Sequence, residues 1–187
     1  MDEEQLRAIT VGELTPYATK VVIADYDPAW PDWFEHDRAR ISAALGPVAL
    51  SIDHVGSTSV PGLPAKPVID IVLQVADSAD EETYVPALEA AGYRLRVREP
   101  EWYEHRLFYR RDQPPHDVNV HVFSPRYAAE EITRMLAFRD WLRANDQDRD
   151  LYAAAKRELS TRDWRYVQDY ADAKSEVVQE ILARALR

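Results

Sequence analysis

The sequence predicts an α+β fold in which helices pack on a mixed β-sheet. Three observations support this class. Short β-branched segments separated by turn residues lie between residues 48 and 123. Apolar residues recur at helical spacing before that region and again from Glu130 onward. The length of 187 residues, without a linker long enough to separate two parts, is that of one domain.

We expect this single domain, residues 1–187, to have three parts. Residues 1–20 form a loosely organised N-terminal arm, residues 21–125 an α/β core, and residues 126–187 a helical C-terminal part. A chain of this length can bury roughly 70% of its unfolded surface, so a core can form without disulfides or a structural metal. The chain has no cysteine, which excludes thiol catalysis and cysteine zinc sites.

The first helix is predicted to begin near Asp27 and to end at Gly46. The Asp27 side chain can accept hydrogen bonds from unpaired N–H groups, and Pro28 fits a first helical turn. Gly46 followed by Pro47 is a helix-stop signal. The apolar residues in between recur at helical spacing: Trp30, Trp33, Phe34, Ile41 and Leu45.

The core region alternates between strands and irregular segments. Strands are expected over residues 48–55, 68–75, 93–98, 102–109 and 117–123, and a short helix over residues 82–91. The segment Gly56–Pro67 contains two glycines and three prolines, and ordered backbone of this kind is typical of functional loops. The turn at 111–115 predicts that the last two strands form an antiparallel hairpin.

Three helices are expected in the C-terminal part, over residues 130–144, 148–159 and 163–186. The last of these carries an apolar stripe with Lys174 in its middle. A lysine there either extends to the rim of the interface or reaches an anion. Tyr170, one turn earlier, would place its hydroxyl beside that ammonium group.

The charge balance restricts the partners of the chain. There are 33 acidic and 23 basic side chains, a net charge of -10, which argues against nucleic acid because non-specific phosphate contacts need lysine or arginine. The acidic N-terminus is no signal peptide, and the longest apolar run is far shorter than the roughly 18 residues of a membrane span. We expect a cytoplasmic protein without a membrane partner, as a monomer or small homo-oligomer.

Several polar residues do not fit their predicted surroundings. Asp70 lies in a strand that is expected to be buried on both faces. It is either paired by a salt bridge or hydrogen bond, or it is a metal or substrate ligand. Asp117, Asn119 and His121 alternate with valines, so all three share one face of a strand. That face is either simply solvated or orients a ligand.

Only four of the 23 basic residues are lysines. A compact, mobile ammonium differs from a planar guanidinium, so these positions are candidates for anion contacts. Lys66 ends the glycine-containing loop, and Lys156 flanks an apolar helical stripe. Arg106, on a predicted strand, is a further candidate for binding a phosphate or carboxylate.

The turn Gly56–Ser59 follows a strand, where small residues let backbone N–H groups and hydroxyls approach an anion. A plain turn is the alternative. The spacing to Lys66 excludes a Walker loop, and neither a dinucleotide fingerprint nor a nucleophile elbow occurs. The sequence has no closely spaced histidine pair on a predicted helix, which argues against a zinc hydrolase. His54, His105 and His121 lie on separate predicted strands and could converge only by folding.

The sequence around this turn resembles the signature of the GrpB family. The resemblance covers nearly the whole chain. The residues that carry it are His54–Leu63, Ala65–Ile71, Tyr26–Pro31, Phe138–Arg143, Tyr170 and Lys174.

The resemblance implies a nucleotidyltransferase-like fold. In that superfamily a Gly-Ser turn precedes a strand with two carboxylates one residue apart, and a third carboxylate lies on a later strand. Carried over, the turn is Gly56–Ser57, the first carboxylate is Asp70 and the third is Asp117, but the second position holds Val72. Two-metal phosphoryl transfer needs several carboxylates, so membership of the fold does not carry the reaction with it.

Two further family properties bear on function. Members usually carry histidine-rich sequence on the later strand, which His121 matches and Asn119 does not. In some actinobacterial proteins a GrpB-like domain is fused to dephospho-coenzyme A kinase, which implies a link to nucleotides. This chain has no kinase segment with a Walker loop and is expected to be the stand-alone form.

We therefore predict a protein that binds a nucleotide or related phosphate compound between the sheet and the C-terminal helices. If it is an enzyme, it transfers a nucleotidyl group to a small acceptor, with Asp70 and Asp117 holding one Mg²⁺ and His121 moving a proton. The residues predicted to bind substrate are Gly56, Ser57, Thr58, Ser59, Lys66, Arg106, Asn119, Lys156, Tyr170 and Lys174. The alternatives are a non-catalytic nucleotide-binding or partner-docking module, and an interaction protein without a phosphate ligand.

Overall fold

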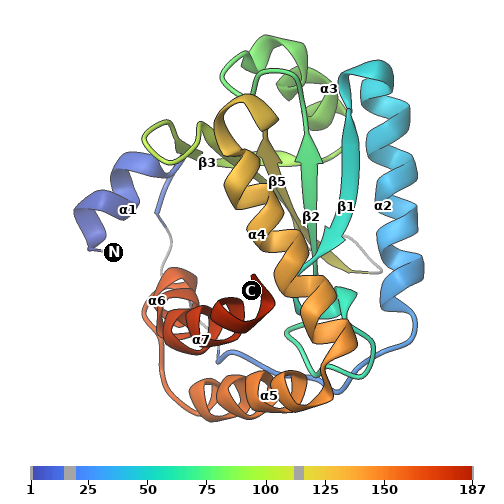
Figure 1. Cartoon of the computed structure of the whole chain (residues 1–187). Helices are drawn as coiled ribbons and strands as arrows, with labels where there is room; N and C mark the ends of the chain where they lie inside the picture. Colours follow the sequence, from blue (N-terminus) through green and yellow to red (C-terminus); the bar gives the residue numbers. More distant parts are fainter. Residues whose placement is uncertain (1, 15–19, 112–115, 187) are drawn as a thin grey trace.

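A computed structural model describes residues 2–14, 20–111 and 116–186 of the chain. It contains a five-stranded sheet with the strand order β1-β2-β5-β4-β3 (Figure 1). The parallel pair is β2 and β5, and the other neighbours are antiparallel. The strands are β1 (Ser51–Val55), β2 (Val68–Gln74), β3 (Arg94–Glu99), β4 (His105–Arg110) and β5 (Asp117–Phe123). This mixed sheet with helices confirms the α+β class.

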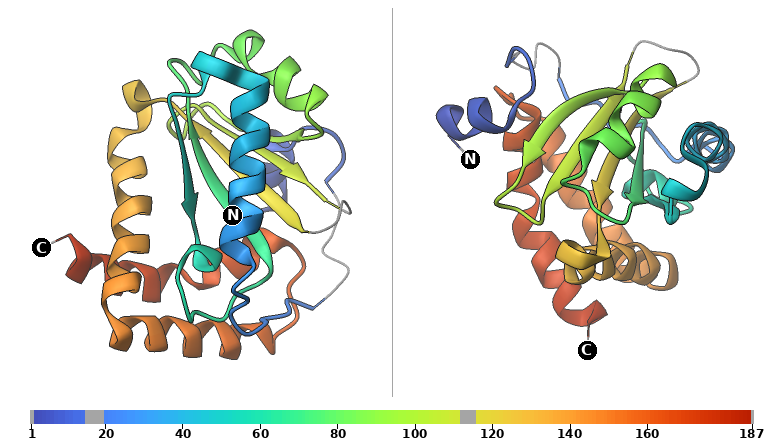
Figure 2. Two further views of the ribbon diagram at one scale, coloured as in Figure 1. Left: turned by 90° about the vertical axis from the view of Figure 1, so that its right-hand side faces the viewer. Right: turned by 90° about the horizontal axis from the view of Figure 1, so that it is seen from above.

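Helices α2 (Trp30–Leu45) and α3 (Val85–Ala90) cover one face of the sheet (Figure 2). The apolar residues of α2 that predicted a helix meet the inward residues of β2 and β5 there. The core at this contact includes Trp30, Phe34, Ile41, Ile69, Ile71, Leu73, Val118 and Val120. Each such side chain contributes about 1.5–3 kcal/mol when it is fully buried, so this contact anchors the sheet.

Helix α4 (Pro125–Ala144) covers part of the opposite face. Val55 and Val72 of the sheet pack against Ala128 and Ile132 of the helix. The backbone of Ala128 departs from helical geometry, so the first turn of α4 is kinked. Because α4 packs on Val55 and Val72, these two side chains are sealed from solvent.

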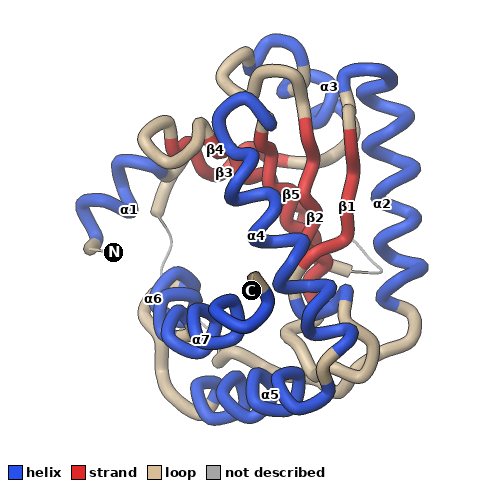
Figure 3. The backbone as a smooth tube through the Cα atoms, in the orientation of Figure 1, coloured by secondary structure: helices blue, strands red, loops and turns tan. Residues whose placement is uncertain are grey.

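Helices α5 (Asp146–Ser160) and α7 (Ser175–Ala185) pack beside the loop that joins β1 to β2 (Figure 3). Helix α6 (Val167–Ala173) lies between them in sequence and contacts α7. Val60 and Leu63 of the loop form an apolar cluster with Leu142, Tyr152 and Ile181. The loop is therefore held between the sheet and the helices, where the sequence predicts a ligand site. None of the helices in the described ranges is long and apolar enough to cross a membrane.

The predicted elements differ from the structure in several places. Within the N-terminal arm, the described residues 2–14 contain α1 (Glu3–Ile9), and Thr10 pairs with Val97 of β3; residues 15–19 lie outside the described residues. The segment predicted as one helix, residues 163–186, is divided into α6 and α7 at Lys174. Periodicity did not reveal this break, since the apolar spacing continues across it.

Smaller differences concern element boundaries. A short 3-10 helix, η1 (Gly46–Val48), delays the start of β1 to Ser51, and η3 (Glu81–Thr83) precedes α3. A turn also occupies the start of the strand predicted over residues 102–109. The hairpin of β4 and β5 is antiparallel as predicted, although residues 112–115 of its turn lie outside the described residues.

Candidate functional site

Asp70 stands directly beside the turn that begins at Gly56. It is the third residue of β2 and pairs with Val55, the last residue of β1. A Cβ atom at Gly56 would lie 2.5 Å from Oδ2 of Asp70, and the φ angle of Gly56 is +67°. Only glycine combines this backbone conformation with such a close approach, so the turn is built against the carboxylate.

Asn119 of β5 lies opposite Asp70 and links it to a cation. Its Nδ2 donates to Oδ1 of Asp70 at 2.8 Å. Its Oδ1 accepts a hydrogen bond from Arg111, which also donates to the carbonyl of Val118 at 2.6 Å. The Arg111 guanidinium lies 3.7 Å from the carboxylate of Asp117. Asp117 is therefore paired with Arg111, two positions from Asn119 along β5.

The electrostatic environment of Asp70 combines burial with positive charge. Burial raises the pKa of the carboxyl. A hydrogen bond from Asn119 and the charges of Lys174, Arg111 and Lys66 lower it. These cations come from the junction of α6 and α7, the end of β4 and the loop before β2. Lys66 and Lys174 thus lie close enough to Asp70 for their charges to lower its pKa. The structure adds Arg111, which sequence reasoning missed because nothing distinguishes it among 19 arginines (23 basic residues less four lysines).

Two lysines on the helical side have different surroundings. Lys174 is half-buried and its ammonium lies 4.5 Å from the centre of the Tyr170 ring, so it contacts the ring face. Lys156 is only 2% exposed, and its Nζ donates to the carbonyl of Pro64 at 2.5 Å. Burial lowers the pKa of Lys156 to about 7, and the charges of Lys174 and Arg157 act in the same direction.

Lys156 therefore supports the loop from inside the protein, whereas the sequence predicted that it binds substrate. Its ammonium also lies 4.7 Å from the centre of the Tyr152 ring. Burial raises the pKa of Tyr152 to about 12, although a hydrogen bond with the side chain of Ser57 acts to lower it. Ser57 is half-buried, whereas Thr58 and Ser59 are buried, so its hydroxyl is the most exposed of the three in the turn.

The other hydroxyls of the turn hold its fold. The Thr58 hydroxyl is buried, donates to the carbonyl of Val68 at 3.2 Å and lies 3.0 Å from Nε2 of His54. The Ser59 hydroxyl donates to the carbonyl of Gly56 at 2.6 Å. These two predicted phosphate contacts are engaged within the protein, and they keep the turn in place beside Asp70.

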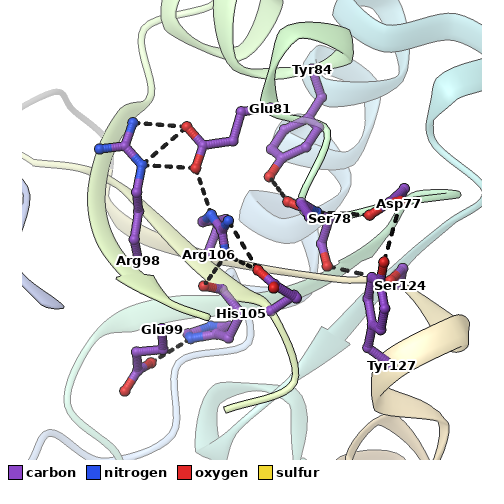
Figure 4. Close-up of polar contacts among 12 residues, drawn as sticks. Asp77, Ser78, Glu81, Tyr84, Arg98, Glu99, His105, Arg106, Ser124 and Tyr127 are labelled. Atoms are coloured by element: carbon purple, nitrogen blue, oxygen red, sulfur yellow. Dashed lines mark hydrogen bonds and ion pairs between the residues drawn. The ribbon is translucent and has the colours of Figure 1, made fainter. Parts of the chain in front are cut away.

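Arg106 lies outside this cluster, which corrects its prediction as a phosphate ligand. It pairs with Val122 in the sheet and so faces the side of α3, away from Asn119 and His121. Its Nε donates to Glu81 at 2.6 Å and its terminal nitrogens lie 3.2 Å from Glu104 (Figure 4). Strand alternation explains the difference, because neighbouring residues of a strand face opposite sides.

His121 shares the face of Asp117 and Asn119, as the alternation predicted. Its Nδ1 lies 3.1 Å from Nε2 of His105, whose Nδ1 lies 2.7 Å from the carboxylate of Glu99. Burial, with a smaller effect of His105, lowers the pKa of His121 to about 3. Two of the three strand histidines therefore converge. The third, His54, stacks instead on Phe34 at 4.7 Å in the core.

A second buried polar cluster lies on the far side of the sheet. Asp37 of α2 accepts hydrogen bonds from Tyr93 at 2.5 Å and from Arg110 at 3.0 Å, and it lies 2.5 Å from His116. Trp33 stacks on His116. The Asp37 carboxylate is buried and is surrounded by partners. This cluster therefore anchors α2 to the strands.

The donor set around Asp70 does not fit a divalent cation. In the described ranges no group of three or more histidine, aspartate or glutamate side chains is arranged to hold a metal. Val72, at the position of the second carboxylate, is 0% exposed under α4. Asp70 itself is surrounded by positive charges and receives an amide donor. These features disfavour Mg²⁺, which binds through oxygen ligands.

The fold and this cluster define an α+β protein with a cation-rich polar site around one carboxylate. Comparisons with known proteins identify the family. The model of the family described as GrpB protein matches residues 20–184. The UPF0157 protein BH1888 of Halalkalibacterium halodurans is 57% identical over 183 residues, 98% of this chain and 91% of that protein. The chain belongs to the GrpB family.

Two other relatives extend this relationship. The crystal structure of conserved protein GrpB from Enterococcus faecalis has a TM-score of 0.73 and 28% identity, and covers 88% of this chain and 97% of that one. A dephospho-CoA kinase of Mycolicibacterium paratuberculosis is 34% identical over 182 residues, which are 85% of this chain but 44% of the kinase. The similarity thus covers less than half of the kinase.

Proposed function

We propose that this protein binds a nucleotide or a related small phosphate compound at the cluster around Asp70. One observation carries the proposal: Lys66, Arg111 and Lys174, from distant parts of the chain, all act on one half-buried carboxylate. The chain as a whole has a net charge of -10. A local concentration of cations in an anionic molecule attracts an anion to that place.

The roles of the side chains follow from their chemistry. The ammonium groups of Lys66 and Lys174 and the guanidinium of Arg111 hold the phosphate oxygens. Ser57 donates its hydroxyl hydrogen to the same group. Asp70, oriented by Asn119, accepts a hydrogen bond from a hydroxyl group of the ligand. A sugar phosphate carries both groups: its phosphate can bind the cations, and its hydroxyl groups can donate to Asp70.

Nucleotidyl transfer to a small acceptor is the second candidate. The resemblance to nucleotidyltransferase-like proteins and the similarity to a dephospho-CoA kinase support it. The buried Val72 argues against a two-metal mechanism, so we propose binding as the function and derive no step through Mg²⁺. The same site in a non-catalytic module would bind the ligand and leave it unchanged.

A thermal-shift experiment tests the proposal. The panel contains nucleotides, coenzyme A precursors and sugar phosphates, each with and without Mg²⁺. A ligand at 100 times its dissociation constant adds about 2.7 kcal/mol of stability. We expect Lys66→Ala and Lys174→Ala to weaken binding roughly tenfold or more, the range of one charge-assisted hydrogen bond. Lys20→Ala is the matched control, since the Lys20 side chain is 72% exposed.

The outcomes separate the candidates. Stabilisation that depends on both cluster lysines supports binding, and product formation in a separate assay would add transfer. No stabilisation by any member of the panel, or equal loss in the Lys20→Ala control, would contradict the proposal and favour an interaction protein. Stabilisation by a ligand that appears only with Mg²⁺ would overturn our conclusion that the donor set around Asp70 does not fit a divalent cation.

A further inference from the structure

Three titratable side chains from adjacent strands form a hydrogen-bonded chain that ends on the face of the candidate site. Glu99 is the last residue of β3, His105 the first of β4, and His121 lies within β5. The Glu99 carboxylate lies 2.7 Å from Nδ1 of His105, as Figure 4 shows. Nε2 of His105 lies 3.1 Å from Nδ1 of His121. Both ring nitrogens of His105 therefore take part in this series of hydrogen bonds.

Aromatic neighbours fix the position of the middle ring. His105 is 3% exposed. Its ring stacks on Phe123 at 4.7 Å, and the edge of Trp102 lies against it at 5.0 Å. The turn between β3 and β4 places Tyr103 and Glu104 at positive φ angles. Such backbone conformations cost of order 1–3 kcal/mol each and cluster at functional sites.

With both rings neutral and the carboxylate ionised, one arrangement of hydrogens satisfies both contacts. Nδ1 of His105 donates to Glu99, which can only accept, and Nε2 of His105 is an acceptor. The donor to that acceptor is then Nδ1–H of His121, which leaves a lone pair on Nε2 of His121. Across the described ranges Nε2 of His121 makes no protein hydrogen bond. This nitrogen is therefore available to a ligand.

The surroundings of His121 connect it to the cationic cluster. Asn119, which binds Asp70, lies two residues away on the same face of β5. The cross-strand neighbours of Asn119 and His121 are Tyr109 and Leu107. These four residues are half-buried, whereas the strand positions between them are buried. Solvent and small molecules can therefore reach this face.

We propose that Nε2 of His121 accepts a hydrogen bond from a hydroxyl group of the bound ligand, and that Glu99 and His105 are positioning residues for it. The identity of the ligand rests on the proposed function. Nδ1–H of His121 donates to His105, which Glu99 orients, so the lone pair of Nε2 is left for the ligand.

Spectroscopy and chemical modification test the chain without an assumed activity. In the intact protein, ¹⁵N NMR should show neutral His121 with its hydrogen on Nδ1. Diethyl pyrocarbonate should modify Nε2 of His121, with the exposed His36 as internal reference. We expect Glu99→Gln to lower that reaction roughly tenfold, the range of one charge-assisted hydrogen bond. Glu101→Gln, an exposed position in the same turn, is the matched control.

Two results would overturn the inference: His121 with its hydrogen on Nε2, or equal reactivity in both glutamine variants. Because Glu99→Gln could instead disturb the fold, thermal unfolding is measured on each sample. His105→Phe, which keeps an aromatic ring beside Phe123, serves as a second variant. It must also lower the reaction of His121 while the protein stays folded, or the inference fails.

A binding experiment separates this inference from the proposed function. The probes are inorganic phosphate and ribose 5-phosphate. His121→Phe should weaken ribose 5-phosphate roughly tenfold and leave inorganic phosphate unchanged. If neither these probes nor any member of the thermal-shift panel binds to the unmodified protein, the proposed function fails, and the NMR and modification results still decide the state of His121. Equal weakening of both probes would contradict the role of His121 toward a hydroxyl group.

Discussion

Gly56 is the residue on which the geometry of the candidate site depends most directly. The carboxylate of Asp70 lies where a Cβ at this position would be, and the φ and ψ angles of Gly56, 67° and -173°, lie in a region that other residues rarely adopt. Gly46 also has a positive φ angle, but no atom lies within 4 Å of a Cβ added there. Substitutions at these two glycines therefore distinguish the cost of backbone strain from the cost of a collision with Asp70.

We expect Gly56→Ala to lower the free energy of unfolding by more than Gly46→Ala. Backbone strain accounts for about 1–3 kcal/mol at either position, and the collision with Asp70 adds to it only at Gly56. Denaturation in urea measures both values. Equal losses would show that the turn moves away from Asp70 at no cost.

Lys156 makes stability depend on pH. Its pKa of about 7 in the folded protein lies below the ordinary value of 10.5 because the ammonium is buried. Between these values the unfolded chain binds a proton that the folded protein does not. Stability should therefore rise with pH from about 7 toward 10, by at most about 1.4 kcal/mol per pH unit.

Lys156→Met removes the titrating group, so we expect its free energy of unfolding to change less between pH 7 and pH 9.5. Denaturation curves at the two pH values measure this difference. Lys20→Met, at an exposed lysine, should keep the slope of the unmodified protein. A slope that survives in Lys156→Met would place the pH dependence in another group.

At the scale of elements, the helices are tied together by a few buried polar contacts. Asp148 of α5 accepts from the indole of Trp141 in α4 at 2.6 Å and from Arg184 in α7 at 2.6 and 2.9 Å. Arg143 of α4 donates to the carbonyl of Ser59 at 2.9 and 3.0 Å. Through these contacts the helices position the loop that carries Gly56.

Asp148→Ala should therefore destabilise the protein by about 1–3 kcal/mol, because it leaves the indole N–H and the guanidinium without their acceptor. Asp150→Ala, an exposed position on the same helix, should change stability by less than about 0.5 kcal/mol. Thermal and chemical denaturation report both values. Similar losses would mean that the removal of a negative charge near the N-terminus of α5, and not the loss of the Asp148 contacts, is responsible.

Local periodicity predicted most elements of the fold. The valines of β5 and the apolar positions of α2 have regular spacings, and both elements lie where these spacings place them. The break at Lys174 was missed because the apolar stripe continues across it. The helix α1 was missed because it buries only Leu6, so its sequence has almost no periodic signal.

The candidate site was predictable where unusual residues interrupt an apolar pattern, as at Asp70 and Lys174. Lys66 was found from its place at the end of the loop. The partners that only folding brings near could not be found in this way. Arg111 acts through Asn119, and Glu99 acts through His105, in contacts that depend on the register of neighbouring strands. Side-chain direction also mattered, since Arg106 and His105 are adjacent but face opposite sides.

At the scale of the whole molecule, the central strands β2 and β5 are tightly packed, whereas the short helices α1 and α6 are more lightly anchored. The inward residues of β2 and β5, such as Ile71 and Val120, are 0% exposed. Helices α1 and α6 have seven residues each, which is too short to be stable without tertiary contacts. Local stability should follow this difference in burial.

Hydrogen exchange measured by mass spectrometry should show this gradient. We expect the amides of β2 and β5 to exchange only through global unfolding, and those of α1 to exchange much earlier, because few buried contacts protect them. A ligand at the Asp70 cluster should slow exchange in the segment around Lys174. Uniform protection from α1 to β5 would contradict this description of the fold.

The contact between Gly56 and Asp70 also constrains how the family can diverge. A methyl group at position 56 has room only if the carboxylate at position 70 is shortened or lost. A lineage that abandons the acid is then free to abandon the glycine, whereas one that retains the acid cannot. In homologous sequences these two positions should be inherited as a pair, and the loss of both together would mark the members that have given up the ligand.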